Sequence, residues 1–144
     1  MPESTFSHTA VANADPARVW QSLQRAETWR GMARIDRVWG ANADDAGNLV
    51  SFRWLSAVAG QEWEGVTRVT DSQPGIAMTL ALESEEIEAE INVTIAPAGD
   101  STRVRVDLAA RSQGFLSGMF WPAVKDALNR GLVRQVEAFA MSFE

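Results

Sequence analysis

A strict alternation between residues 87 and 95 limits the folds open to this chain more than any other feature. Isoleucine, alanine and valine fill the odd positions of this run, while glutamate, asparagine and threonine fill the even ones. Side chains of a β-strand point alternately to opposite faces, so the pattern predicts a strand with one apolar and one solvated face. The apolar face requires neighbouring strands with matching faces, and it requires a cover.

The same stretch holds five glutamates between positions 83 and 90, which raises the alternative of catalytic carboxylates or a metal site. We predict that Leu82 pairs with Ile87, which makes residues 83–86 a solvated hairpin loop. Glu88 and Glu90 then point outward, where arginines of the next strand can pair with them. A metal site needs converging oxygens, and this layout spreads them, so we expect no metal here.

Period-two patterns recur through the middle of the chain, separated by segments rich in Gly, Pro, Asn and Asp. These segments are typical of turns. Short turns join consecutive strands into antiparallel pairs, so the pattern predicts one antiparallel sheet. The expected strands are 5–12, 34–40, 49–55, 62–70, 76–82, 87–95 and 101–110, and the clearest expected turns are 42–47, 71–75 and 97–100.

Helical signals flank the strands. Asp15 before Pro16 marks a helix start, because aspartate caps free amides and proline at the first helical position loses no hydrogen bond. We expect this helix to end near Arg25, followed by a second short helix or turn over 27–32. Apolar residues recur every four positions from 116 to 136, which predicts a long amphipathic helix over 118–141.

The order of these elements predicts an α+β architecture in one domain, residues 1–144. A chain of 144 residues is long enough to bury a core of its own. The terminal helix is the one element long enough to cover the apolar face of the sheet. We therefore expect a bent antiparallel sheet of six to seven strands wrapped around that helix, with one or two short helices after the first strand.

Composition excludes several classes of function. The net charge of −6 and the lack of any Lys/Arg cluster argue against nucleic acid and anionic membranes as partners. Cysteine is absent and His8 is the single histidine, so thiolate chemistry and multi-histidine metal sites are excluded. No G-x-S-x-G elbow or phosphate-binding glycine loop occurs. We expect no cofactor.

Location and assembly are expectations of the same kind. The polar start has no signal-peptide pattern, and no apolar run approaches the ~20 residues that span a bilayer. We therefore expect a cytoplasmic protein without membrane insertion. A monomer and a homodimer both remain open.

Three segments resemble a known family. TAVANADPARVWQSLQRAETW (9–29), VTRVTDSQPG (66–75) and RGLVRQVEAFAMSFE (130–144) are similar to the opening, a central strand-to-turn stretch and the last helix of one family. It is the polyketide cyclase/dehydrase branch of the START-like, or Bet v 1-like (SRPBCC), superfamily. The resemblance implies the helix-grip fold, with an apolar cavity between the long helix and the sheet that binds lipids, polyketides, sterols or other hydrophobic molecules.

The resemblance implies that the cavity is lined from the strands and from the start of the long helix. Aromatic and aliphatic side chains dominate these positions, which is the usual composition of a small-molecule pocket. The same side chains could simply fill a core, because aromatic residues bury area in any protein. The candidates are Trp39, Phe52, Trp54, Trp63, Met78, Leu80, Ile91, Val93, Phe115, Phe120, Val124 and Leu128.

A few polar residues could orient a ligand in such a cavity, and His8, Glu64 and Arg68 are the candidates. The alternation along their strands does not show whether these side chains point into the cavity or outward, and the same holds for Asp36 and Arg53. An outward, solvated position is favoured for each, because a charge buried without a partner costs several kcal/mol. Glu64 and Arg68 share one strand face, so if either enters the cavity both can.

Two functions remain open at this point, beside the less favoured possibility of a helper surface for a protein partner. The first is binding of a hydrophobic small molecule, lipid- or polyketide-like, in the internal cavity. The second is a polyketide cyclase/dehydrase-type enzyme that uses polar groups of the same cavity for proton transfer. Binding is favoured, because a chain with one histidine, no tyrosine and no cysteine has few side chains suited to proton transfer. Whether the protein is an enzyme stays open.

Overall fold

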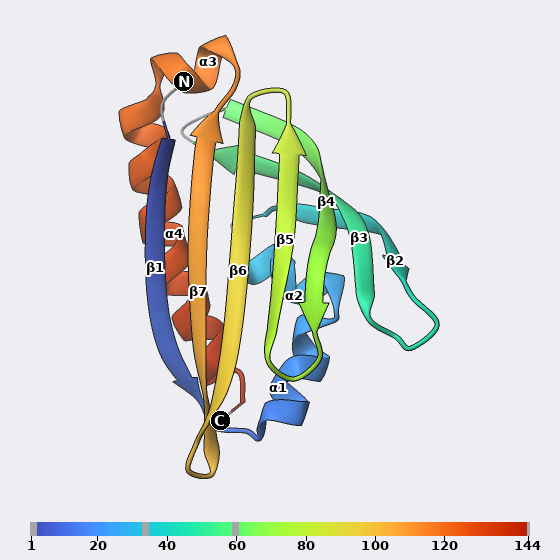
Figure 1. Cartoon of the computed structure of the whole chain (residues 1–144). Coiled ribbons are helices and arrows are strands. Elements are labelled where there is room, and N and C mark those ends of the chain that lie inside the picture. Colours follow the sequence, from blue (N-terminus) through green and yellow to red (C-terminus); the bar gives the residue numbers. More distant parts are fainter. Residues whose placement is uncertain (1–2, 33–34, 59–60, 144) are drawn as a thin grey trace.

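A computed structural model describes residues 3–32, 35–58 and 61–143 of the chain (Figure 1). Its elements follow the expected order of one strand, two short helices, six strands and a terminal helical region. They are β1 (Glu3–Ala12), α1 (Pro16–Leu23), α2 (Ala26–Met32), β2 (Arg37–Ala43), β3 (Leu49–Val58), β4 (Gln61–Gln73), β5 (Ala77–Ser84), β6 (Ile87–Ala98), β7 (Ser101–Ser112), α3 (Phe115–Met119) and α4 (Trp121–Met141).

All seven strands form one antiparallel sheet in the order β1-β7-β6-β5-β4-β3-β2. The sheet is curled, and α4 runs behind β1, while α1 approaches β6 and β7 and α2 approaches β2 and β3 on the same side (Figure 1). We call the side facing the helices the inner face and the opposite side the outer face. A curled antiparallel sheet around one long helix is the helix-grip fold, so the predicted fold class is confirmed.

The first helix begins as the sequence predicts. The Asp15 carboxylate accepts a hydrogen bond of 2.9 Å from the backbone N–H of Arg18, and Pro16 stands in the first turn. The helix ends at Leu23, slightly before the predicted end. The indole N–H of Trp29 donates to the Leu23 carbonyl over 2.9 Å, and this buried bond joins α1 to α2.

Several boundaries differ from the prediction. β4 continues to Gln73, through the start of the expected 71–75 turn, because a register shift between Val69 and Asp71 lets the strand keep pairing with β5. The expected helix over 118–141 is divided near Phe120 into α3 and α4, and Pro122 lies in the first turn of α4. The expected strand 34–40 is observed at Arg37–Ala43, and residue 34 lies outside the described part.

The β5–β6 register is two residues away from the predicted one. Leu82 pairs with Ala89 rather than with Ile87. The Ser84 hydroxyl explains the difference, because it accepts a hydrogen bond from the Ile87 N–H (3.0 Å) and donates one to the Ile87 carbonyl (3.1 Å). These bonds close the hairpin around residues 85 and 86, and a shift of two leaves every side chain on its predicted face.

Glu86 is not the solvated loop residue that the sequence predicts. Its carboxylate accepts a 2.7 Å hydrogen bond from the backbone N–H of Ser117 in α3. Its carbonyl accepts from the N–H groups of Gln113 and Gly114 over 2.9 and 3.3 Å. Glu86 therefore ties the β5–β6 hairpin to the chain segment that leaves β7.

A matched pair of variants tests this tie. Glu86→Ala should lower the free energy of unfolding by about 1–2 kcal/mol, because it leaves the backbone N–H of Ser117 without its carboxylate acceptor. Glu85→Ala changes an exposed neighbour in the same turn and should change stability by less than about 0.5 kcal/mol. Urea unfolding of both variants measures the difference, and equal losses would contradict the assigned role of Glu86.

Candidate functional site

The centre of the inner face is aromatic. Phe52 and Trp54 of β3 and Trp63 of β4 are 1%, 5% and 6% exposed. Beside them, two cross-strand pairs of buried aliphatic side chains join β5 to β6, Met78 with Val93 and Leu80 with Ile91. These seven candidates from the sequence lie together on one face, because parity along each strand directs them to the same side.

Trp54 lies across a glycine of the neighbouring strand. Gly65 pairs with Trp54, and a Cβ atom at Gly65 would lie 2.3 Å both from the indole ring and from the Glu83 carbonyl oxygen. No side chain other than hydrogen fits in such a space. Gly65 therefore allows the indole to extend over the β4 backbone toward β5.

The long helix does not cover this aromatic centre with its backbone. Within the described residues, α4 approaches β1 most broadly and then α2, and it meets β7 and β3 at only a few positions. On α4, Val124 is fully buried and Leu128 is half-buried, while Phe120, just before the helix, is 41% exposed. Side chains must therefore span the interval between α4 and the middle strands of the sheet.

Two polar atoms on the inner face are buried without a hydrogen-bond partner in the described part of the chain, namely Trp54 Nε1 and Thr67 Oγ1. Thr67 lies on β4, opposite Phe52 of β3 and Leu82 of β5. Thr67 and Gly65 are not among the site residues expected from the sequence. Alternation along the strand could have identified them, because Trp63, Gly65 and Thr67 are two residues apart and therefore share one face.

The charged candidates lie on the other side of the sheet. Glu64 is exposed on the outer face, with its Oε1 atom 3.6 Å from Nη2 of Arg53 on β3. Arg68 is exposed on the same face of β4. Asp36 precedes β2, and its carboxylate accepts a 2.7 Å hydrogen bond from the Ala57 N–H. None of these four charges joins the aromatic centre.

His8 is placed differently. It lies on β1 with the inward parity of Ala10 and Ala12, and its Nε2 atom is 2.7 Å from Oε1 of Glu137 on α4. The two side chains are 24% and 50% exposed. They form a pair at the junction of β1 and α4, at the edge of the sheet, away from Phe52 and Trp54 on β3.

Two aromatic candidates do not join the inner face. Trp39 pairs with Arg53 on the outer face, and the guanidinium of Arg37 lies 4.8 Å from the centre of its ring. This cation–π contact accounts for a half-buried tryptophan on an edge strand. Val38 takes the inward position opposite Trp54 instead. The side chain of Phe115 lies outside the described residues.

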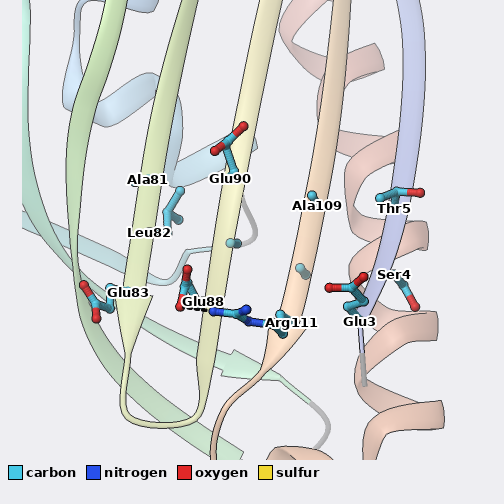
Figure 2. A pocket seen from close by; sticks show the side chains of 12 residues that line it. Glu3, Ser4, Thr5, Ala81, Leu82, Glu83, Glu88, Glu90, Ala109 and Arg111 are labelled. Atoms are coloured by element: carbon cyan, nitrogen blue, oxygen red, sulfur yellow. Dashed lines mark hydrogen bonds and ion pairs between the residues drawn. The ribbon is translucent and has the colours of Figure 1, made fainter. Parts of the chain in front are cut away.

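The outer face carries a shallow depression of about 360 Å³ over β1, β7, β6 and β5 (Figure 2). The small side chains of Ala81 and Ala109 form part of its floor, and glutamates line it. One of these, Glu88, forms an ion pair of 2.7 Å with Arg111. The predicted pairing of Glu88 with an arginine of the next strand is therefore confirmed. Among the described residues, no three His, Asp or Glu side chains are grouped closely enough to hold a metal ion.

Sequence and structural comparisons place the chain among known proteins. The family model for "polyketide cyclase / dehydrase and lipid transport" matches residues 3–144. A START superfamily protein from Mycobacterium smegmatis is similar at a TM-score of 0.75 and 18% identity, over 97% of this chain and 99% of that one. The Zhui aromatase/cyclase from Streptomyces sp. R1128 gives 0.79 and 12%, over 99% and 94%.

A protein from Thermus thermophilus has the same fold at a TM-score of 0.73 and 14% identity, over 96% of this chain and 98% of that one. No curated protein sequence matches the chain. None of the described helices is both long enough and apolar enough to cross a bilayer.

The outer face also supplies a pH-dependent contribution to stability. The Arg105 guanidinium, with its Nε 3.1 Å from Asp107 Oδ2, lowers the pKa of that carboxyl; burial opposes this effect, and the Ser7 hydroxyl adds to it. A carboxyl with a lowered pKa stabilises the fold above its usual pKa of 3.8, and the contribution is lost as the pH falls through the lowered value.

Asp107→Asn should therefore lower the free energy of unfolding at neutral pH by less than about 1 kcal/mol, since the pair is solvent-screened. The deficit should shrink as the pH falls below the usual carboxyl pKa of 3.8 and disappear once the wild-type carboxyl is also protonated. Asp100→Asn in the exposed β6–β7 turn is the control. Urea unfolding at neutral pH and over a series of acidic pH values measures the effect, and a deficit that stays constant throughout the acidic series would contradict the ion-pair explanation.

Proposed function

The chain belongs to the polyketide cyclase/dehydrase and lipid transport family, and from that premise we propose that it binds a hydrophobic small molecule between the inner face of its sheet and α4. One observation carries the proposal. The aromatic centre formed by Phe52, Trp54 and Trp63 lies over strands that the backbone of α4 does not approach broadly. A concave, largely apolar surface beside a helix is a typical setting for a small-molecule site.

Binding is favoured over catalysis by the positions of the charged side chains. In the described part of β3 to β7, Asp, Glu, Arg and Lys side chains occupy outward positions of the register. General acid–base catalysis needs an ionisable group within hydrogen-bond reach of the reacting atom. The His8–Glu137 pair joins β1 to α4 at the sheet edge, and the Asp126–Arg130 pair is exposed on α4. The lining therefore favours binding without proton transfer.

The names of two relatives agree with a hydrophobic ligand but do not choose one. The Streptomyces relative is an aromatase/cyclase, and the Mycobacterium relative is a START superfamily protein. At sequence identities of 12% and 18%, these similarities indicate a shared fold but not a shared reaction. Polyketide-like and lipid-like molecules are therefore both included among the test compounds.

A thermal-shift screen tests the proposal. A ligand present at about a hundred times its dissociation constant should add about 2.7 kcal/mol to the free energy of unfolding. The screen should contain long-chain ketones, sterols and fused-ring aromatic ketones. Stabilisation by at least one class is expected, and no shift with any of them would contradict the proposal.

Leu128→Trp locates the site within the molecule. Leu128 is half-buried on the inward side of α4, so a larger side chain there should fill the interval and weaken ligand binding by at least about tenfold, or 1.4 kcal/mol. Asn129→Trp changes the exposed neighbour and should leave affinity unchanged. Titration of each variant with a stabilising compound measures the difference. Unchanged affinity in Leu128→Trp would place the ligand elsewhere.

A further inference from the structure

The two unpartnered polar atoms on the inner face are the observation that the binding proposal leaves unexplained. Trp54 and Thr67 are 5% and 0% exposed, and neither Nε1 nor Oγ1 has a hydrogen-bond partner in the described chain. Buried polar groups in native proteins are nearly always paired, because an unpaired group loses its bonds to water without replacement. Two such groups on one face call for an explanation.

The two residues occupy neighbouring positions on the inner face. Trp54 lies across Gly65, and Thr67 stands two residues further along β4 on the same face. Positions two apart on a strand are separated by about 7 Å. Phe52 and Leu82 are the cross-strand neighbours of Thr67, and Ser84, whose hydroxyl is already bonded to Ile87, pairs with Gly65. We therefore treat the two unpartnered atoms as one polar spot.

Their chemistry limits what can satisfy them. An indole N–H donates and cannot accept, whereas a threonine hydroxyl can do either. The missing partner of Trp54 is therefore an acceptor, and an oxygen atom that accepts from Trp54 can also accept from Thr67. Neutral carbonyl oxygens have two lone pairs and meet this requirement.

The charge of the surroundings favours a neutral oxygen over a carboxylate. The arginines at positions 53, 68, 105 and 111 stand on the outer face or its rim. A carboxylate buried at the polar spot would lack a counter-charge from the described inner face, at a cost of several kcal/mol.

We propose that Trp54 and Thr67 form an oxygen-recognition site, which selects neutral apolar ligands that carry a ketone or similar carbonyl group. This inference rests on the proposed function, since it assigns the polar contact within the same binding site. The apolar part of the ligand packs on Phe52, Trp63 and Leu80, and its carbonyl oxygen accepts from the indole N–H and the hydroxyl.

Matched probes separate the two claims. The pairs are 9-fluorenone with fluorene and 2-tridecanone with tridecane, which differ within each pair by a carbonyl oxygen. Affinities are measured by tryptophan fluorescence and thermal shift. The wild-type protein should bind each ketone about two- to tenfold more tightly than its hydrocarbon for each hydrogen bond formed.

Three variants assign this preference to the side chains. Thr67→Val removes the hydroxyl at nearly constant shape and should reduce the ketone preference by about two- to tenfold, while hydrocarbon affinity stays the same. Thr67→Ser retains the hydroxyl and should retain the preference. Thr94→Val makes the same change at an exposed outer-face position of β6 and should have no effect.

The stability of the protein without ligand provides a second test. Thr67→Val removes an unpaired buried hydroxyl, so its melting temperature without ligand should equal or exceed that of the wild type. This sign opposes the loss expected if the hydroxyl had an internal partner. A clear loss of stability in Thr67→Val with an unchanged ketone preference would overturn the inference.

Failure of the inference differs from failure of the proposed function. Equal affinity of the wild type for ketone and hydrocarbon, or an undiminished preference in Thr67→Val, overturns the oxygen-recognition site and leaves hydrophobic binding intact. Absence of binding by all four probes overturns both.

Discussion

The width of the sheet relative to the helix that covers it is the constraint on which this structure depends. Seven strands spaced about 4.8 Å apart form a surface roughly 30 Å wide, whereas an α-helix with its side chains is about 10 Å across. α4 therefore covers β1 closely, while α1 approaches β6 and β7 and α2 approaches β2 and β3 (Figure 1). The strands between them depend on the curl of the sheet and on large side chains.

This constraint gives the aromatic residues their position. Phe52, Trp54 and Trp63 lie on β3 and β4, on the side of the sheet away from β1, where long side chains are needed to reach across the interior. Gly65 makes the arrangement possible by removing the one Cβ atom that would meet the Trp54 ring. The same packing buries the indole N–H on the inner face that also carries the Thr67 hydroxyl, and these two buried groups are the basis of the proposed recognition site.

Alternation in the sequence was enough to predict the sheet, its antiparallel pairing and the facing of β5, β6 and β7. It could not predict the register of the β5–β6 hairpin, because pairing Leu82 with Ile87 or with Ala89 places the same side chains inside. The choice depends on the Ser84 hydroxyl and on the contact of Glu86 with Ser117, which lies far along the chain.

The candidate site was predicted less completely, again for physical reasons. β4 has apolar residues on both parities, so Glu64 and Arg68 could be assigned to the outer face only through their pairing with β3. Trp39 looked like a core residue by type, yet Arg37 covers it on the outside. Trp54 Nε1 and Thr67 Oγ1 lack a partner among the described residues, and this could not be found from sequence because it depends on how the side chains pack.

The central claim is that ligands bind at the inner face, and NMR of the tryptophan indole N–H groups tests it most directly. The chain has six tryptophans, and Trp39 on the outer face serves as an internal control. Titration with 2-tridecanone should shift the indole N–H signals of Trp54 and Trp63 and leave the Trp39 signal unchanged. The Trp54 signal should move downfield, because its N–H gains a hydrogen bond. Shifts confined to Trp39 and to amides of the outer-face depression would contradict the account.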